Sequence, residues 1–141
     1  MNINLDRIRS QFEKDRFATL NGVIIESASE ECVCCSIAIE ERHKNSLGGV
    51  QGGAIFTLAD FAFAVHANLA YACGSEPSPT VGQSCNISFL KGTRGSKLYA
   101  RSKCISKGRN ISVFQVSVTD DLGVHIAEMS ATGFTTNGNK T

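Results

Sequence analysis

The feature that most constrains this chain is the alanine-rich stretch from Ala54 to Ala72, which contains no Pro and no Gly. It is long enough for about five helical turns, and apolar residues fall on nearly every side of the predicted helix. Asp60, His66 and Asn68 interrupt the apolar run, and a charge inside a lipid-spanning segment is costly. We therefore expect a helix enclosed by the protein's own structure, not a membrane span.

Alternating apolar and polar residues on both sides of this helix predict strands. Two strands are expected between Val23 and Glu40, and four more follow the Pro-containing loop after the helix: Thr80 to Leu90, Lys97 to Ser106, Ile111 to Thr119 and Val124 to Thr135. Short turn signals such as Asp120-Asp121-Leu122-Gly123 separate them, so the later strands are joined mainly by hairpins.

The ends of the chain are predicted separately. Leu5, Ile8, Phe12 and Phe17 recur at roughly helical spacing, so residues 1–20 are expected to form one amphipathic helix, and residues 137–141 a frayed tail. The order of elements in residues 21–136 predicts an α+β domain in which an antiparallel sheet curves around a long central helix. Composition and periodicity predict only this hotdog-like layout, and no family.

Length and charge exclude several classes of protein. A chain of 141 residues is one domain, and 14 Lys+Arg against 13 Asp+Glu leave a formal charge of +1. Without a basic field, nucleic acid is not an expected partner. The N-terminus shows no basic segment followed by an apolar one, so we expect a cytoplasmic protein.

Six cysteines are present, and reduced thiols are expected because a core of this size needs no disulfide framework. Cys32, Cys34 and Cys35 lie close enough together to suggest a metal site with His43, but no CxxC pair supports it. We favour packing positions on a strand, with no metal and no cofactor.

Gly52 and Gly53 precede the predicted helix, and Asp60 lies in its second turn. A helix N-terminus offers unsatisfied backbone N–H groups to an anion or to a developing oxyanion, although an isolated glycine pair is more often only a flexible loop end. A carboxylate in an apolar helix needs either a buried donor or a chemical role as base or nucleophile.

Eight residues separate Gly52 from Asp60, which is about 12 Å along a helix axis. One carbonyl group does not reach both positions in a single chain. If two such helices lie antiparallel across a twofold axis, Asp60 of one chain meets Gly52 of the other, and a homodimer contains two complete sites.

The stretch from Asn45 through the Gln51-Gly52-Gly53 turn to Asp60 and Ala62 resembles the motif of the PaaI-like (phenylacetic acid degradation type) hotdog thioesterases. The segments from Cys85 to Lys91 and from Gly95 to Ala100 resemble the next two strands of that family. The resemblance implies hydrolysis of acyl-CoA or acyl-carrier thioesters without a metal, in a homodimer that is usually part of a dimer of dimers. It also implies Asp60 as general base or nucleophile, Gly52 as the oxyanion N–H and Asn45 as an orienting amide.

Two features depart from the family pattern. Gln51 stands where the family usually has His; a Gln side chain donates hydrogen bonds but does not titrate. We include Gln51 and Gly53 in the predicted site. Where relatives carry Ser or Thr after the central helix, this chain offers Thr80, Gln83 and Ser84, among which the sequence does not choose.

Several cations fall in or beside predicted turns: Lys91, Arg94, Lys97, Lys107 and Arg109. The resemblance suggests contacts with the CoA phosphates, while charged turn residues are usually only solvated. His66 is six residues beyond Asp60, off its helical face, and is expected to be an interior histidine; His43 carries no motif. The competing function is a hotdog protein that binds acyl-CoA without turning it over, and a hydratase on the same fold ranks last.

Overall fold

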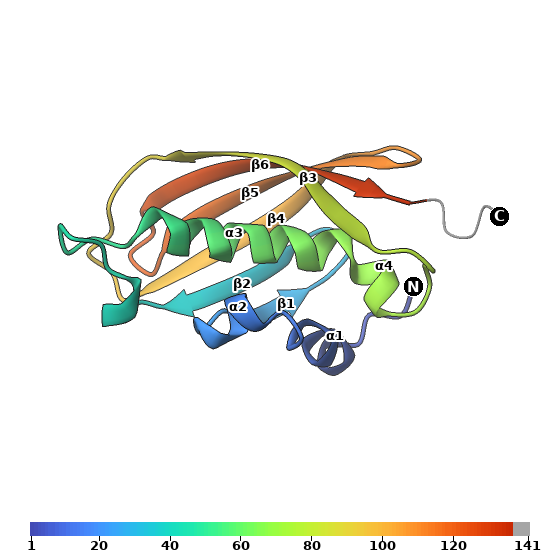
Figure 1. Cartoon of the computed structure of the whole chain (residues 1–141), viewed down its shortest axis with the longest axis horizontal. Helices are drawn as coiled ribbons and strands as arrows, with labels where there is room; N and C mark the ends of the chain where they lie inside the picture. The colour runs from blue at the N-terminus through green and yellow to red at the C-terminus, as the bar shows by residue number, and fades with distance from the viewer. Residues whose placement is uncertain (137–141) are drawn as a thin grey trace.

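A six-stranded antiparallel sheet curves around one long helix in the computed structural model, which describes residues 1–136 (Figure 1). The predicted tail, residues 137–141, lies outside the described residues. The helices are α1 (Leu5–Phe12), α2 (Arg16–Leu20), the 3-10 turn η1 (Glu41–His43), α3 (Gly52–Ala67) and α4 (Leu69–Ala72). The strands are β1 (Ile24–Ala28), β2 (Val33–Ala38), β3 (Thr80–Phe89), β4 (Lys97–Lys107), β5 (Ile111–Asp120) and β6 (His125–Thr135).

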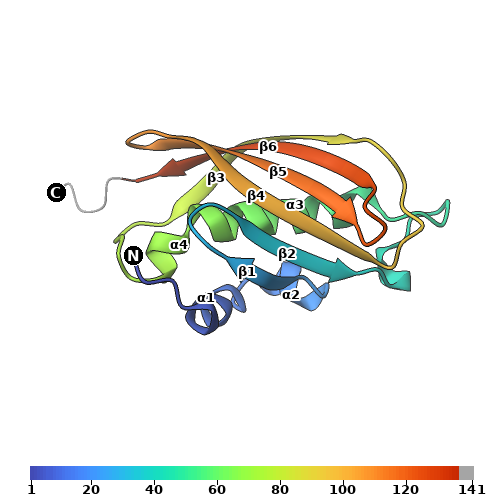
Figure 2. The ribbon, with the colours of Figure 1, turned by 180° about the vertical axis from the view of Figure 1, so that it is seen from behind.

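The strand order is β1-β2-β4-β5-β6-β3, and every neighbouring pair is antiparallel. The two strands predicted before the central helix and the four predicted after it are all present, so the α+β, hotdog-type prediction is confirmed. Figure 2 shows the sheet from its outer side, with α3 behind it. Strands β1 and β3 form the two edges of the sheet.

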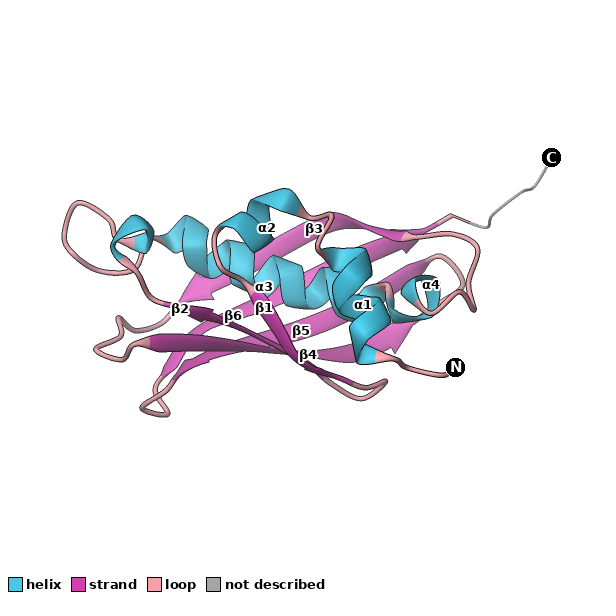
Figure 3. Ribbon diagram, turned by 90° about the horizontal axis from the view of Figure 1, so that it is seen from below, coloured by secondary structure: helices cyan, strands magenta, loops and turns pink. Residues whose placement is uncertain are grey.

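Helix α3 is enclosed as the sequence predicted. Leu58, Ala59, Ala62 and Val65 are each 0% exposed, and small alanines let the strands approach the helix closely. Alternate residues of the strands complete this core, for example Val116 and Val118 on β5, Leu98 on β4 and Met129 on β6. The helices lie on the concave side of the sheet (Figure 3).

The prediction of a single N-terminal helix is wrong. The helical spacing breaks after α1, and the Asp15 side chain accepts a hydrogen bond from the Ala18 N–H to start α2. As a result Phe17 is 70% exposed instead of joining the apolar face of α1.

The central helix is also shorter than predicted because it ends at Ala67. The buried Asn68 side chain donates to the carbonyl of Thr80 and accepts from its N–H, at 2.9 and 2.7 Å. These bonds tie the end of α3 to the first residue of β3. The chain then forms the short helix α4, which is about one turn long.

The cysteines take the packing positions expected for a strand. Cys35 is fully buried, Cys34 is half-buried on the other face of β2, Cys32 is half-buried just before that strand, and all six thiols are free. Within residues 1–136, no cluster of three or more metal-ligating side chains occurs. Nor is any helix in that part of the chain long and apolar enough to cross a membrane.

Candidate active site

The N-terminus of α3 presents one unused backbone donor. Gln51 is the N-cap: its carbonyl accepts from the N–H groups of Ala54 and Ile55, and its side-chain oxygen accepts from the Gly53 N–H. The Gly52 N–H makes no hydrogen bond to any residue in the described range. It lies at the positive end of the helix dipole, where an anion or oxyanion is stabilised.

The loop before α3 is shaped by Asn45. Its side-chain oxygen accepts from the N–H groups of Leu47 and Gly49, at 2.9 and 3.1 Å, and Gly48 adopts a positive φ of 83° at the loop tip. Asn45 therefore folds the loop around its own oxygen, which leaves the amide nitrogen as its available donor. Its role as an orienting amide stays a prediction.

Asp60 is half-buried and has no hydrogen-bond partner within residues 1–136. Burial raises the pKa of its carboxyl group above the ordinary value, and the nearby Asp15 carboxylate adds to the rise. An unpaired carboxylate of this kind is a better base at neutral pH than an exposed one, and is a candidate for a chemical role.

The pocket beside Asp60, about 470 Å³ in volume, is open to solvent. It brings together all three residues among which the sequence did not choose: Thr80, Gln83 and Ser84. Its apolar wall consists of Phe56, Phe63, Ala64 and Gly82. Polar groups from β3 and an apolar wall from α3 therefore surround the carboxylate.

Gly52 lines a different pocket, of about 410 Å³, together with Phe89 and Lys91. None of the pocket residues around Asp60 belongs to it. One chain thus keeps the free N–H and the carboxylate apart, as their eight-residue separation predicted. Both pockets border the edge strand β3, the first at its N-terminal half and the second at its C-terminal end.

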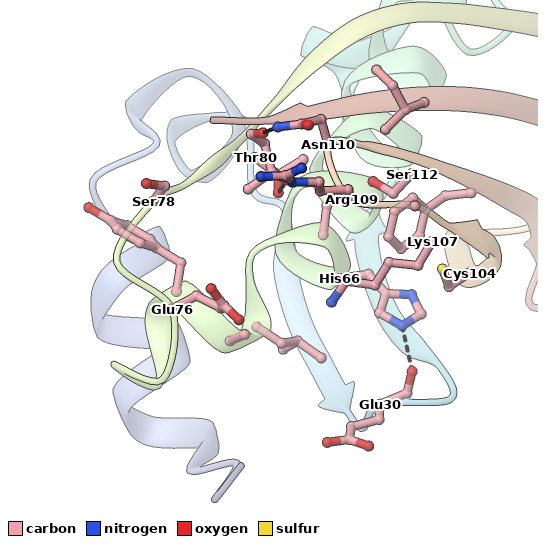
Figure 4. Close-up of a pocket in the computed structure, with 18 of the residues that line it drawn as sticks. Glu30, His66, Glu76, Ser78, Thr80, Cys104, Lys107, Arg109, Asn110 and Ser112 are labelled. Carbon is pink, nitrogen blue, oxygen red and sulfur yellow. Dashed lines mark hydrogen bonds between the residues drawn. The ribbon is translucent and has the colours of Figure 1, made fainter. Parts of the chain in front are cut away.

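Lys107 and Arg109 line a third cavity, of about 380 Å³, between the β4–β5 hairpin and the end of α3 (Figure 4). Glu76 and Ser78 of the loop after α4 lie across from them. Of the other predicted cations, Lys91 joins the pocket at Gly52, and the exposed Arg94 lines none of these three pockets.

Two buried histidines have structural partners. His66 contacts the Glu30 carbonyl at 2.8 Å (Figure 4) and the Ser102 hydroxyl at 3.1 Å, which confirms the expectation of an interior histidine. His43, to which the sequence assigned no role, is 3% exposed and contacts the Asn21 carbonyl and the Glu40 N–H. Both of its partners are backbone groups, which any residue type supplies, so no sequence motif predicts these contacts.

A curved antiparallel sheet around one central helix is the hotdog architecture, and here the helix carries a free N–H at its start and an unpaired carboxylate further along. The model of the family described as the thioesterase superfamily matches residues 47–127, which include both groups. The chain belongs to the thioesterase superfamily. The prediction of a thioester-hydrolysing enzyme is thereby confirmed at the level of the family.

Individual relatives agree with this assignment. The chain is 29% identical over 112 residues to the acyl-coenzyme A thioesterase PaaI of Escherichia coli, covering 79% of this chain and 76% of that protein. Thioesterase HI1161 of Haemophilus influenzae superposes with a TM-score of 0.86 at 22% identity, over 97% of this chain and 93% of that one. The protein smu.793 of Streptococcus mutans, solved with acetyl CoA bound, gives a TM-score of 0.71 at 25% identity, over 82% and 89% of the two chains. The resemblance to PaaI-like thioesterases is confirmed.

Proposed function

We propose that this protein hydrolyses acyl-CoA thioesters, with Asp60 of one chain and the Gly52 N–H of a second chain acting on the same carbonyl group. The observation that carries the proposal is the unpaired Asp60 carboxylate in an apolar-walled pocket, with its pKa raised by burial. Membership of the thioesterase superfamily and the likeness to an acyl-coenzyme A thioesterase support the reaction class.

The edge strand β3 supports a homodimer. It is ten residues long, its outer edge carries no strand within the described range, and Val81 and Phe89 are 56% and 54% exposed. A strand edge of this length with exposed apolar side chains is normally paired or covered. Pairing with a second copy extends the sheet across a twofold axis. That such dimers pair again into a dimer of dimers stays a prediction.

Antiparallel pairing of two β3 strands also completes the site. The Asp60 pocket borders Gly82, Gln83 and Ser84 in the N-terminal half of β3, and the Gly52 pocket borders Phe89 at its other end. In an antiparallel pair, the first half of one strand lies opposite the second half of its partner. Each Asp60 pocket is then adjacent to the Gly52 pocket of the other chain, and the dimer contains two sites.

In this site the thioester carbonyl accepts a hydrogen bond from the Gly52 N–H, with Asn45 holding the carbonyl or the water. Asp60 removes a proton from water as the water oxygen attacks the carbonyl carbon, and the negative charge moves to the carbonyl oxygen beside Gly52. The C–S bond then breaks, the thiolate leaves and takes up the proton that Asp60 removed, and the carboxylic acid is released. Alternatively, Asp60 attacks the carbonyl carbon first and the thiolate leaves; water then hydrolyses the resulting anhydride to the carboxylic acid and the Asp60 carboxylate.

The cations supply a place for the phosphates of CoA. Lys107 and Arg109 border the cavity that Thr80 also lines, at the start of β3. Antiparallel pairing brings the end of the partner strand, followed by Lys91 and Arg94, toward the same region. Glu30 and Glu76 line the same cavity, so the two cations from the second chain supply the net positive charge of this region, which favours a ligand with several negative charges. The apolar wall of Phe56 and Phe63 suits an aryl or a fatty acyl group.

The test is free-thiol release from aryl-, short-chain and long-chain acyl-CoAs by the wild type and by Asp60→Asn. We expect turnover by the wild type and its loss in the variant, with CoA-ester binding retained because the amide has the shape of the carboxyl group. No turnover by either protein, despite measurable binding, would instead favour the alternative, a non-catalytic acyl-CoA-binding hotdog protein.

A further inference from the structure

The loop that leads into α3 is tied to the N-terminal part of the chain by a buried side chain that no motif marks. The His43 ring is 3% exposed; its Nδ1 contacts the Glu40 N–H at 2.9 Å, and its Nε2 contacts the Asn21 carbonyl at 2.8 Å. Asn21 is the residue that ends α2, and it lies 22 positions earlier in the sequence. The ring therefore joins two segments that are distant along the chain.

The two partners fix the tautomer of this ring. The Glu40 N–H is a donor, so Nδ1 must be the acceptor, and the Asn21 carbonyl is an acceptor, so Nε2 must carry the hydrogen. Only the neutral Nε2–H form satisfies both contacts. Of the two bonds, the one to Asn21 crosses between segments, whereas the one to Glu40 stays local, between η1 and its N-cap residue.

From His43 a short path of hydrogen bonds leads to the free Gly52 N–H. The His43 carbonyl accepts from the Gln51 N–H at 2.7 Å, and a β-bridge between Lys44 and Val50 closes the base of the loop. Gln51 then caps α3 through its side-chain oxygen on the Gly53 N–H. The hydrogen bonds of the Gln51 N–H and the Gly53 N–H fix the peptide groups on either side of the Gly52 N–H. The direction of the Gly52 N–H therefore depends on the bond between the Gln51 N–H and the His43 carbonyl.

A second tie runs beside the first but is more exposed. The Arg42 side chain donates to the Leu20 carbonyl at 2.6 Å and to the Glu40 carboxylate at 3.1 Å, and it lies at the surface. Exposed contacts of this kind contribute little because water replaces them readily. The buried His43 ring is the firmer of the two anchors.

We propose that His43 is a positioning residue for the oxyanion-binding N–H of Gly52, acting through its Nε2–H bond to Asn21 and its own carbonyl bond to Gln51. This inference rests on the proposed function, because the N–H that it positions is the one assigned to the thioester oxygen. His43 itself does not touch the substrate.

Two substitutions separate the two ring contacts. The amide nitrogen of His43→Gln falls near the position of Nε2 and keeps the bond to Asn21, whereas the amide oxygen of His43→Asn falls near Nδ1 and keeps only the bond to Glu40. We expect His43→Asn to lower kcat by about 10- to 100-fold with KM nearly unchanged, and His43→Gln to restore most of kcat. Ser36→Ala is the matched control: it removes a buried hydroxyl that donates to Glu26 on the outer side of the sheet, and should leave kcat unchanged.

Amide hydrogen exchange gives a second readout that does not depend on turnover. In His43→Asn, exchange at the Gln51 and Gly53 amides should increase, while the Val116 amide in β5 stays protected as in the wild type. Equal kcat in His43→Asn and His43→Gln, or unchanged exchange at Gln51, would overturn the inference. A wild type that is inactive on every thioester would contradict the proposed function, and the exchange result would still decide whether His43 anchors the loop.

Discussion

Removing the Gly52 N–H is a sharp test of the oxyanion assignment, because the structure allows the change with little damage. Gly52 is the first residue of α3, the one helical position where Pro is readily accepted, and its N–H has no partner in residues 1–136. The preceding residue, Gln51, already has φ −65° and ψ 133°, the extended conformation that a following Pro requires. Gly52→Pro should therefore keep the helix and delete the donor.

The magnitude follows from the role assigned to this donor. Loss of one preorganised oxyanion donor typically lowers kcat by about 10²- to 10³-fold, which corresponds to about 3–4 kcal/mol of transition-state stabilisation. A Cβ atom at this position comes 3.2 Å from Cζ of the Phe89 ring, which is half-exposed and is able to shift. Gly52→Ala introduces the same Cβ while keeping the N–H, so it controls for this contact.

The assay is free-thiol release from an acyl-CoA, with kcat and KM determined for the wild type and both variants. We expect Gly52→Ala to stay within a few-fold of the wild type and Gly52→Pro to lose about 10²-fold or more in kcat. If Gly52→Pro, folded as judged by circular dichroism, turns over as fast as Gly52→Ala, the Gly52 N–H does not stabilise the oxyanion.

Two further predictions concern charge. The pKa of Asp60 is raised in the folded state. Its favourable contribution to stability is therefore complete below the unfolded pKa of about 4 and is lost as pH rises through the higher folded pKa. Asp60→Asn should unfold at a higher urea concentration than the wild type at pH 7, and this difference should disappear near pH 4. Replacing Lys107 and Arg109 with Ala should raise KM for acyl-CoA, most strongly at low salt. Hydrolysis of an acyl-N-acetylcysteamine should stay unchanged, because this substrate lacks the phosphates. An equal loss of activity on both substrates would contradict phosphate binding.

Much of the fold could be predicted from the sequence, because burial determines which positions of a helix or strand carry apolar residues. Apolar residues on all sides of α3 predicted its enclosure, and the alternation in the later strands predicted β3 to β6. A single N-terminal helix was predicted because apolar residues recur at helical spacing as far as Phe17. Asp15, however, is a residue type that caps helix N-termini, and it marks the start of α2. The end of α3 was missed because Asn68 stops the helix through bonds to Thr80, which is 12 residues away.

The candidate site was predictable only where side-chain type carries the chemistry. Asp60 stood out as a charge in an apolar helix, and its separation from Gly52 suggested a site shared with a second chain, which stays a prediction. The part played by His43 was not predictable, because its ring contacts are the Asn21 carbonyl and the Glu40 N–H, which any residue types supply. The Gln51 oxygen on the Gly53 N–H likewise depends on a side-chain orientation that sequence does not specify.

The most direct test of the account is a complementation measurement between two inactive variants. Asp60→Asn and Gly52→Pro are mixed, unfolded and refolded together so that chains pair at random. In a mixed dimer, one site combines an intact Asp60 with an intact Gly52 from the other chain, so about a quarter of the wild-type activity should return. If the mixture releases no more thiol than the separate variants, the two groups act within one chain and the shared site is wrong.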